Sequence, residues 1–275
     1  MREKQRQRAY VHGYSGREAE RLHDQANAVR HLLHDDTCYA PESLVLESGC
    51  GVGAQTAALA ANSPGAHFIS CDIEPASLAQ AREMARQNSF QNVTFINGDI
   101  FSLPFLPNTF DHVFVCFVLE HLENPQAALE KLGRVLKPGG TITVMEGDHG
   151  SCYWHPETQE SVAAWKCLVS VQARTSGDSL IGRRLYPLLS GAGFLDVRVS
   201  PRMVYADQST PRLQDAFVRK TIIPMVEGVK EKALEWRLMD AASWARGIAD
   251  LHQTADRPDG TFCYTFFKAV ARKAS

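Results

Sequence analysis

Short apolar runs alternate with amphipathic stretches through the first half of the chain. The runs predict strands at 44–46, 67–72, 93–97, 112–116 and 141–146, and the stretches between them predict helices that end near 61 or span 75–88 and 125–136. Strands and helices in alternation form a parallel sheet with right-handed crossovers. The pattern therefore predicts a doubly wound α/β domain.

Helical patterns flank this alternation on both sides. In front of it, Ser15 and Glu18 have the spacing of a capping box, and apolar positions then recur at helical intervals up to Leu33. Behind it, helices are predicted at 156–173, 180–190 and about 211–255, and strands at 197–205 and 261–269. Long helical excursions between the late strands of such a sheet tend to become lids or pocket walls.

The composition is that of an ordinary globular protein, with 44% hydrophobic and 22% charged residues. A formal net charge of −2 gives no electrostatic footprint for a polyanion, so nucleic acid is not an expected partner. The seven cysteines include no C-x-x-C pair, no Cys/His spacing resembles a metal site, and no run offers the ~20 apolar residues that span a bilayer. We expect a cytoplasmic protein with no metal and no membrane partner, acting on a small-molecule substrate.

A glycine turn follows the first predicted strand. Gly49, Gly51 and Gly53 allow a tight turn and a close approach to a ligand, although such turns also serve strand–helix packing alone. Asp72 lies 21 positions beyond Gly51, at the end of the second strand, where a carboxylate can accept hydrogen bonds from ribose hydroxyls. A nicotinamide-dependent oxidoreductase shares this sheet and this ribose acid, so it remains an alternative.

The run Glu47-Ser48-Gly49-Cys50-Gly51-Val52-Gly53 resembles the E/D-x-G-x-G-x-G motif of class I S-adenosylmethionine (SAM)-dependent methyltransferases. Further family motifs follow in order as N-G-D-I at 97–100, C-F-V-L-E-H at 116–121 and L-K-P-G-G at 136–140. The resemblance covers about 40–147. It implies a mostly parallel, seven-stranded, Rossmann-like sheet and SAM as the cofactor, bound either by an enzyme or by a non-catalytic regulator.

The resemblance also assigns cofactor-binding residues to the turns that follow the first four strands. They are Glu47, Gly49, Cys50 and Gly51 around the methionyl part, Asp72 at the ribose, Ile73, Asp99 and Ile100 at the adenine, and Phe117 near the methionyl amine. Tyr14 and Arg21 are candidate contacts from a leading helix that covers the cofactor, and a solvated amphipathic helix explains the same charges equally well. Asp111, which opens the fourth strand, is expected to accept a backbone hydrogen bond instead.

The methyl acceptor is expected beyond the carboxyl ends of the strands, where ligands bind in open α/β sheets. The segment after the fifth strand carries His149, Tyr153 and Trp154, which can orient and enclose a small, largely apolar molecule, although a surface loop with aromatic packing has the same composition. His149 and His121 are the candidate general bases, because a neutral imidazole accepts a proton near physiological pH. A structural role remains the alternative for either histidine.

Three segments, 13–21, 146–151 and 221–225, are similar to the terpenoid-indole C-methyltransferases of the teleocidin pathway. This narrower likeness implies natural product biosynthesis, with methylation of a prenyl chain followed by cyclisation. We expect one methyltransferase domain over 1–275, in which 1–34 form an N-terminal helical lid and 40–147 the SAM-binding core. Residues 148–178 and 207–257 are then helical insertions that line the substrate pocket, and the N-terminal helix is a possible contact between copies of a homo-oligomer.

Overall fold

A seven-stranded sheet organises the computed structural model, which describes residues 26, 28–175 and 177–275. The strands are β1 (Leu44–Ser48), β2 (His67–Asp72), β3 (Val93–Asn97), β4 (Phe110–Cys116), β5 (Leu136–His155), β6 (Leu195–Ala206) and β7 (Thr261–Arg272). They lie in the order β3-β2-β1-β4-β5-β7-β6. The first five pair in parallel, and β7 runs antiparallel to both β5 and β6. The predicted doubly wound, mostly parallel sheet is therefore confirmed.

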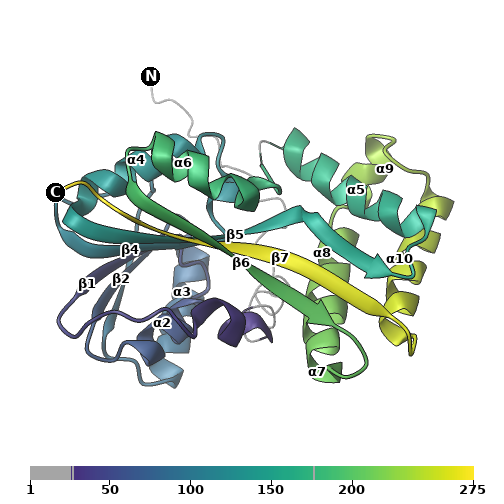
Figure 1. Cartoon of the computed structure of the whole chain (residues 1–275), viewed down its shortest axis with the longest axis horizontal. Coiled ribbons are helices and arrows are strands. Elements are labelled where there is room, and N and C mark those ends of the chain that lie inside the picture. Colours follow the sequence, from purple (N-terminus) through teal and green to yellow (C-terminus); the bar gives the residue numbers. More distant parts are fainter. Residues whose placement is uncertain (1–25, 27, 176) are drawn as a thin grey trace.

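Helices cover both faces of the parallel part of the sheet. Figure 1 shows α2 (Thr56–Asn62) and α3 (Pro75–Gln87) on one face, and α4 (Pro125–Val135) and α6 (Leu185–Gly191) on the other. Local sequence fixes where α4 begins, because the Asn124 side chain accepts the Ala127 N–H and Pro125 occupies the first turn. Short 3₁₀ turns, η1 (Leu119–His121) and η2 (Ile181–Arg184), precede α4 and α6.

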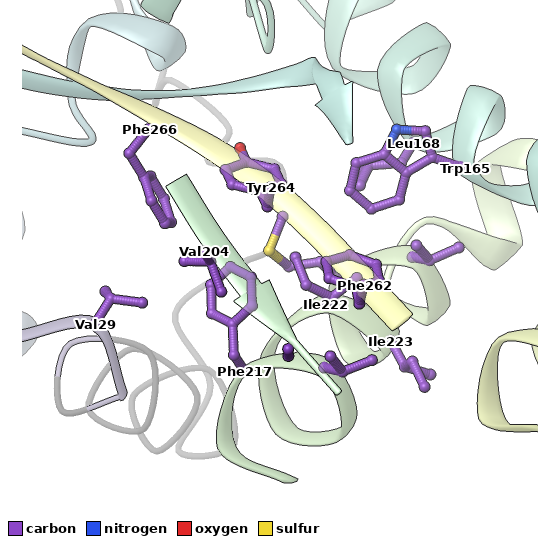
Figure 2. Close-up of a cluster of buried hydrophobic side chains, with 14 of the residues drawn as sticks. Val29, Trp165, Leu168, Val204, Phe217, Ile222, Ile223, Phe262, Tyr264 and Phe266 are labelled. Carbon is purple, nitrogen blue, oxygen red and sulfur yellow. The ribbon is translucent and has the colours of Figure 1, made fainter. Parts of the chain in front are cut away.

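A second group of helices surrounds the far ends of β5, β6 and β7 (Figure 1). It comprises α5 (Gln159–Arg174), α7 (Pro211–Leu213), the π-helical η3 (Gln214–Ile222), α8 (Ile223–Glu227), α9 (Lys230–Glu235) and α10 (Ala241–Asp256). Figure 2 shows the apolar core that these helices bury against the strands, in which Phe217, Trp165 and Phe262 take part. The single helical stretch predicted over 211–255 is thus divided into several helices.

Strand β5 is much longer than the sequence indicates. The segment 146–154 is predicted to leave the sheet after the fifth strand, and this prediction is wrong, because β5 continues to His155 with an irregularity between Asp148 and Cys152. The extension exists because β7 pairs with it, placing Tyr153 opposite Cys263 and Trp154 opposite Phe262. Glycines at 147 and 150 interrupt the apolar pattern of a strand, so local sequence does not predict this extension.

The described end of the predicted lid is built into the core. Residues 28–34 are helical, and Val29 and Leu33 are buried in the core of Figure 2. The ammonium of Lys268, itself 4% exposed, donates to the Leu33 carbonyl at 3.4 Å and to Asp36 and Thr37 at 2.6 Å each. Residues 1–25 lie outside the described part of the chain, so their role as a lid stays a prediction. Across the described residues, no helix is both long and apolar enough to cross a membrane.

Candidate active site

The glycine turn joins β1 to the ends of its neighbours. Gly49 has a φ of +81°, and its N–H donates to the Cys71 carbonyl of β2 at 2.8 Å. A Cβ on Gly49 would lie 2.3 Å from Cγ2 of Val118, which follows β4. Glycine is required there both by backbone conformation and by space. Cys50 is buried, and its N–H also donates to Cys71 O.

Two carboxyl groups lie beneath this turn. Glu47 is buried, and its Oε2 accepts the hydroxyls of Thr56 at 2.7 Å and Ser70 at 2.6 Å. Burial raises the pKa of Glu47 to about 7 in spite of these bonds. Asp72 accepts the Gly51 N–H at 2.7 Å through Oδ2 and the Glu74 N–H at 2.9 Å through Oδ1, and burial raises its pKa too.

The adenine candidates surround the ends of β2 and β3. Ile73 is 54% exposed beside Asp72, Ile100 is buried, and Asp99 accepts the Phe101 N–H at 2.9 Å. The Gly98 N–H donates to the Asp72 carbonyl at 3.0 Å and so joins the two turns. Asn97, which sequence analysis missed, braces them by donating to the carbonyls of Asp72 and Ile73.

Phe117 occupies the turn after β4. Its φ is +57°, and its N–H donates to the Met145 carbonyl of β5 at 2.9 Å. The structure therefore brings the cofactor candidates of 47–51, 72–73, 99–100 and 117 to one edge of the sheet. Tyr14 and Arg21 lie outside the described residues.

His149 sits in the irregular part of β5. Asp148 fixes this segment by accepting the Gly150 N–H at 2.9 Å, the Ser151 hydroxyl at 2.7 Å and two guanidinium bonds from Arg183 at 2.8 and 2.9 Å. The buried His149 ring shares a 2.8 Å hydrogen bond between Nδ1 and the hydroxyl of Tyr264. The ring centroid of Trp165 is 5.3 Å from that of His149.

Tyr264 of β7 is a site residue that sequence analysis missed. Figure 2 shows it among the rings of Phe266, Phe217 and Phe262. Its ring centroid lies 4.7 Å from that of Phe266, which in turn lies 5.3 Å from that of Phe117. A line of aromatic rings thus connects the turn after β4 with His149. A Cβ on Gly147 would lie 2.3 Å from the Tyr264 hydroxyl. A glycine at this position is therefore a signal in the sequence that another side chain approaches the strand closely.

Tyr153 and Trp154 point to opposite faces of β5, because successive strand residues alternate. Trp154 is buried, stacks on Phe262 and donates from Nε1 to Ser161 at 3.1 Å. Tyr153 is 53% exposed, with its hydroxyl 3.8 Å from the sulfur of Met203. The expectation that His149, Tyr153 and Trp154 enclose one pocket needs correction, since only His149 and Trp154 join the aromatic core.

The remaining candidates lie at the edges of this arrangement. His121 in η1 has its Nε2 3.6 Å from Oε1 of Glu120. Asp111 lies at the start of β4, where it accepts the Leu44 N–H at 3.0 Å and pairs with Lys137 at 2.7 Å, which confirms its structural role. The described residues contain no group of three or more His, Cys, Asp or Glu side chains that could hold a metal ion.

Comparison with known proteins identifies the family. A methyltransferase domain model matches residues 46–144. An uncharacterised methyltransferase of Schizosaccharomyces pombe is 35% identical in an alignment 247 residues long, which covers 80% of this chain and 83% of that protein. A demethylmenaquinone methyltransferase of Anoxybacillus flavithermus is 35% identical over 102 residues, 37% of this chain, so the chain spans 43% of that relative's length.

The fold comparison agrees. The crystal structure of a putative methyltransferase from Bacillus halodurans matches this fold with a TM-score of 0.57. The two chains are 18% identical, and the match covers 90% of this chain and 99% of that one. These matches give no support to the alternative of a nicotinamide-dependent oxidoreductase. The chain is thus a member of the class I SAM-dependent methyltransferases, an enzyme whose methyl donor is SAM.

Proposed function

We propose that this enzyme methylates a small, largely apolar acceptor held where β5 and β7 meet α5 and η3. The observation that carries the proposal is the line of aromatic rings from Phe117 to Tyr264 and His149. Apolar walls with a few convergent polar groups are typical of small-molecule sites. The insertions 148–178 and 207–257 supply Trp165 and Phe217 to these walls, which supports their assignment to the acceptor site.

The turns at the sheet edge offer the hydrogen-bond acceptors and the apolar surface that SAM needs. The ammonium and sulfonium of SAM favour nearby carboxyl groups and carbonyls, its ribose diol needs an acceptor, and its adenine needs an apolar surface with a polar edge. We assign Glu47, Gly49, Cys50, Gly51 and Phe117 to the methionyl end. Asp72 has lone pairs left for ribose hydroxyls, since each oxygen accepts one backbone N–H. Ile73, Asp99 and Ile100 form the adenine side, and Tyr14 and Arg21 are proposed lid contacts.

His149 is the proposed general base. SAM supplies an electrophilic methyl group, and an acceptor that loses a proton on methylation needs a group to receive it. The hydrogen bond between Nδ1 of His149 and Tyr264 fixes the orientation of the imidazole. Burial raises the pKa of Tyr264 well above its usual range, so this partner stays a neutral phenol. His121 is the second candidate base, because it follows β4 at the same edge.

A narrower proposal is C-methylation of a prenylated indole, followed by cyclisation, in natural product biosynthesis. Methylation of an alkene leaves a carbocation, which the faces of aromatic rings can stabilise. The aromatic core around Tyr264 supports this reaction. The segment 221–225, which carries part of the resemblance, contributes the buried Ile222 and Ile223 to the same core.

The proposed partner is a small molecule rather than nucleic acid or a membrane, in keeping with a net charge of −2. All seven cysteines are free thiols, which supports a cytoplasmic location. We also propose that copies of the chain associate through the N-terminal helix, most of which lies outside the described residues.

The test combines labelled SAM with an extract of small metabolites and identifies the product that gains the methyl group. His149→Ala should lower transfer to that acceptor by about 10²- to 10⁴-fold, while calorimetry finds SAM affinity unchanged. His67→Ala, at an exposed histidine on the other end of β2, is the matched control. Full activity of the His149 variant would remove His149 from the reaction. In a parallel assay with added nucleic acid, labelling of the nucleic acid but of no small metabolite would overturn the proposed substrate class.

A further inference from the structure

Glu146 of β5 is a buried acid that the proposed methyl transfer does not use. Its side chain is 0% exposed, and its Oε1 accepts the N–H of Val118 at 3.0 Å and of Leu119 at 2.7 Å. Its Oε2 is also buried and has no hydrogen-bond partner among residues 28–175 and 177–275. Burying an acid costs folding free energy unless hydrogen bonds compensate for the lost water. The two bonds at Oε1 supply part of this compensation, so the question is what the buried acid does for the turn that it holds.

Those bonds hold a strained turn. Phe117 has a φ of +57°, a conformation that residues other than glycine rarely adopt. Strand β5 fixes the turn twice, through the bond from Phe117 N–H to the Met145 carbonyl and through the Glu146 side chain. Strained backbone persists only where its surroundings over-determine it.

The 117–119 turn also packs against the glycine turn at 49–53. A Cβ at Gly49 would come within 2.3 Å of Val118 Cγ2, so the Val118 side chain approaches the Gly49 backbone as closely as a glycine allows. Any shift of Val118 therefore changes the space over Gly49. Glu146 lies three residues before His149 on the same strand, so one element holds the cofactor turn and carries the candidate base.

Burial raises the pKa of Glu146 well above its ordinary range, and the nearby Glu120 adds to this rise. The neutral acid still offers a carbonyl oxygen to both N–H groups. A glutamine has the same length and also presents one carbonyl oxygen, so it can replace the acid without changing this contact.

We propose that Glu146 is a positioning residue for methyl transfer, holding the 117–119 turn against Gly49 and thereby shaping the surface that receives SAM. It acts through Val118 and Leu119 and touches neither reactant. The proposal rests on the proposed placement of SAM at the glycine turn, and it does not depend on which acceptor is methylated.

The experiment titrates SAM calorimetrically into wild type, Glu146→Gln, Glu146→Ala and Leu132→Ala. Leu132 is a buried residue of α4, and its truncation is the control for a loss of stability that leaves the hydrogen bonds of Glu146 to the turn in place. All titrations are made at a temperature where circular dichroism shows each variant folded. Glu146→Ala should weaken SAM binding about tenfold or more, because two buried N–H groups lose their acceptor. Glu146→Gln should stay within about threefold of wild type, and Leu132→Ala should bind as wild type does.

A second variant covers the case in which Glu146→Ala does not fold. Val118→Ala keeps both backbone bonds but shortens the side chain that contacts Gly49, and we expect a several-fold weaker SAM affinity with the fold retained. The proposal is overturned if folded Glu146→Ala and Val118→Ala bind SAM as tightly as wild type. It is also overturned if Glu146→Gln is as weak as Glu146→Ala, because the shared carbonyl contact then does not explain the effect.

Discussion

Glu47 shows how a single buried residue makes the stability of the fold depend on pH. Its pKa of about 7 lies above the ordinary value of 4.5 because burial disfavours the charged form. A carboxyl whose pKa is raised by folding stabilises the folded state below its unfolded pKa, and this contribution is lost as the pH rises through the folded pKa.

The free energy of unfolding of the SAM-free enzyme should therefore fall between about pH 4.5 and pH 7 by roughly 3 kcal/mol more than that of Glu47→Gln. Urea denaturation of both proteins at pH 5 and pH 8 measures this difference. Parallel pH profiles for the two proteins would show that Glu47 does not titrate in this window.

Strand β5 is the element in which the proposed SAM site and the proposed acceptor site meet. From Met145 to Trp154 it fixes the turn after β4, carries Glu146 and presents His149 to Tyr264. Local sequence could not predict this element, because its extension depends on pairing with β7, and His149 and Tyr264 are 115 residues apart. Gly147 and Gly150 of this strand allow the side chains of Tyr264 and Arg183 to approach its backbone closely.

Gly147→Ala should displace the Tyr264 hydroxyl, since the added Cβ would lie 2.3 Å from it. Tyr264 is buried and its ring cannot move freely, so we expect a loss of about 1–3 kcal/mol in the free energy of unfolding and reduced methyl transfer. Gly150→Ala meets an equally close atom, but that atom is the end of the half-exposed Arg183 side chain, which can move away. Denaturation curves that rank Gly150→Ala as the more damaging change would contradict this view of the strand.

At the scale of the whole molecule, the half that carries the proposed SAM site could be predicted from sequence, and the half that carries the proposed acceptor site could not. Motifs at 47–53, 72 and 97–100 occupy the carboxyl ends of successive parallel strands, so the order of the elements was sufficient to predict that they meet. The second half depends on antiparallel pairing of β7 between β5 and β6 and on the packing of α5, η3 and α8. Such contacts join segments that are far apart in the sequence, so a local sequence pattern cannot predict them.

The burial of single side chains could not be predicted from local sequence for the same reason. Tyr153 and Trp154 are neighbours in sequence, yet one faces outward and the other enters the core, because the segment is a strand. Val29 and Leu33 fall within the segment predicted to form the lid, and tertiary contacts bury both side chains in the hydrophobic core.

The central claim is that SAM binds at the carboxyl ends of β1, β2 and β4, with Asp72 at its ribose. The most direct measurement is a calorimetric titration of SAM into wild type, Asp72→Asn and Asp111→Asn. Asp72→Asn keeps an oxygen for the Gly51 N–H but loses the charged acceptor, so SAM binding should weaken by about 1–3 kcal/mol. Asp111 lies at the opposite end of the sheet and its variant should bind SAM as wild type does. Equal affinities of wild type and Asp72→Asn would contradict the account.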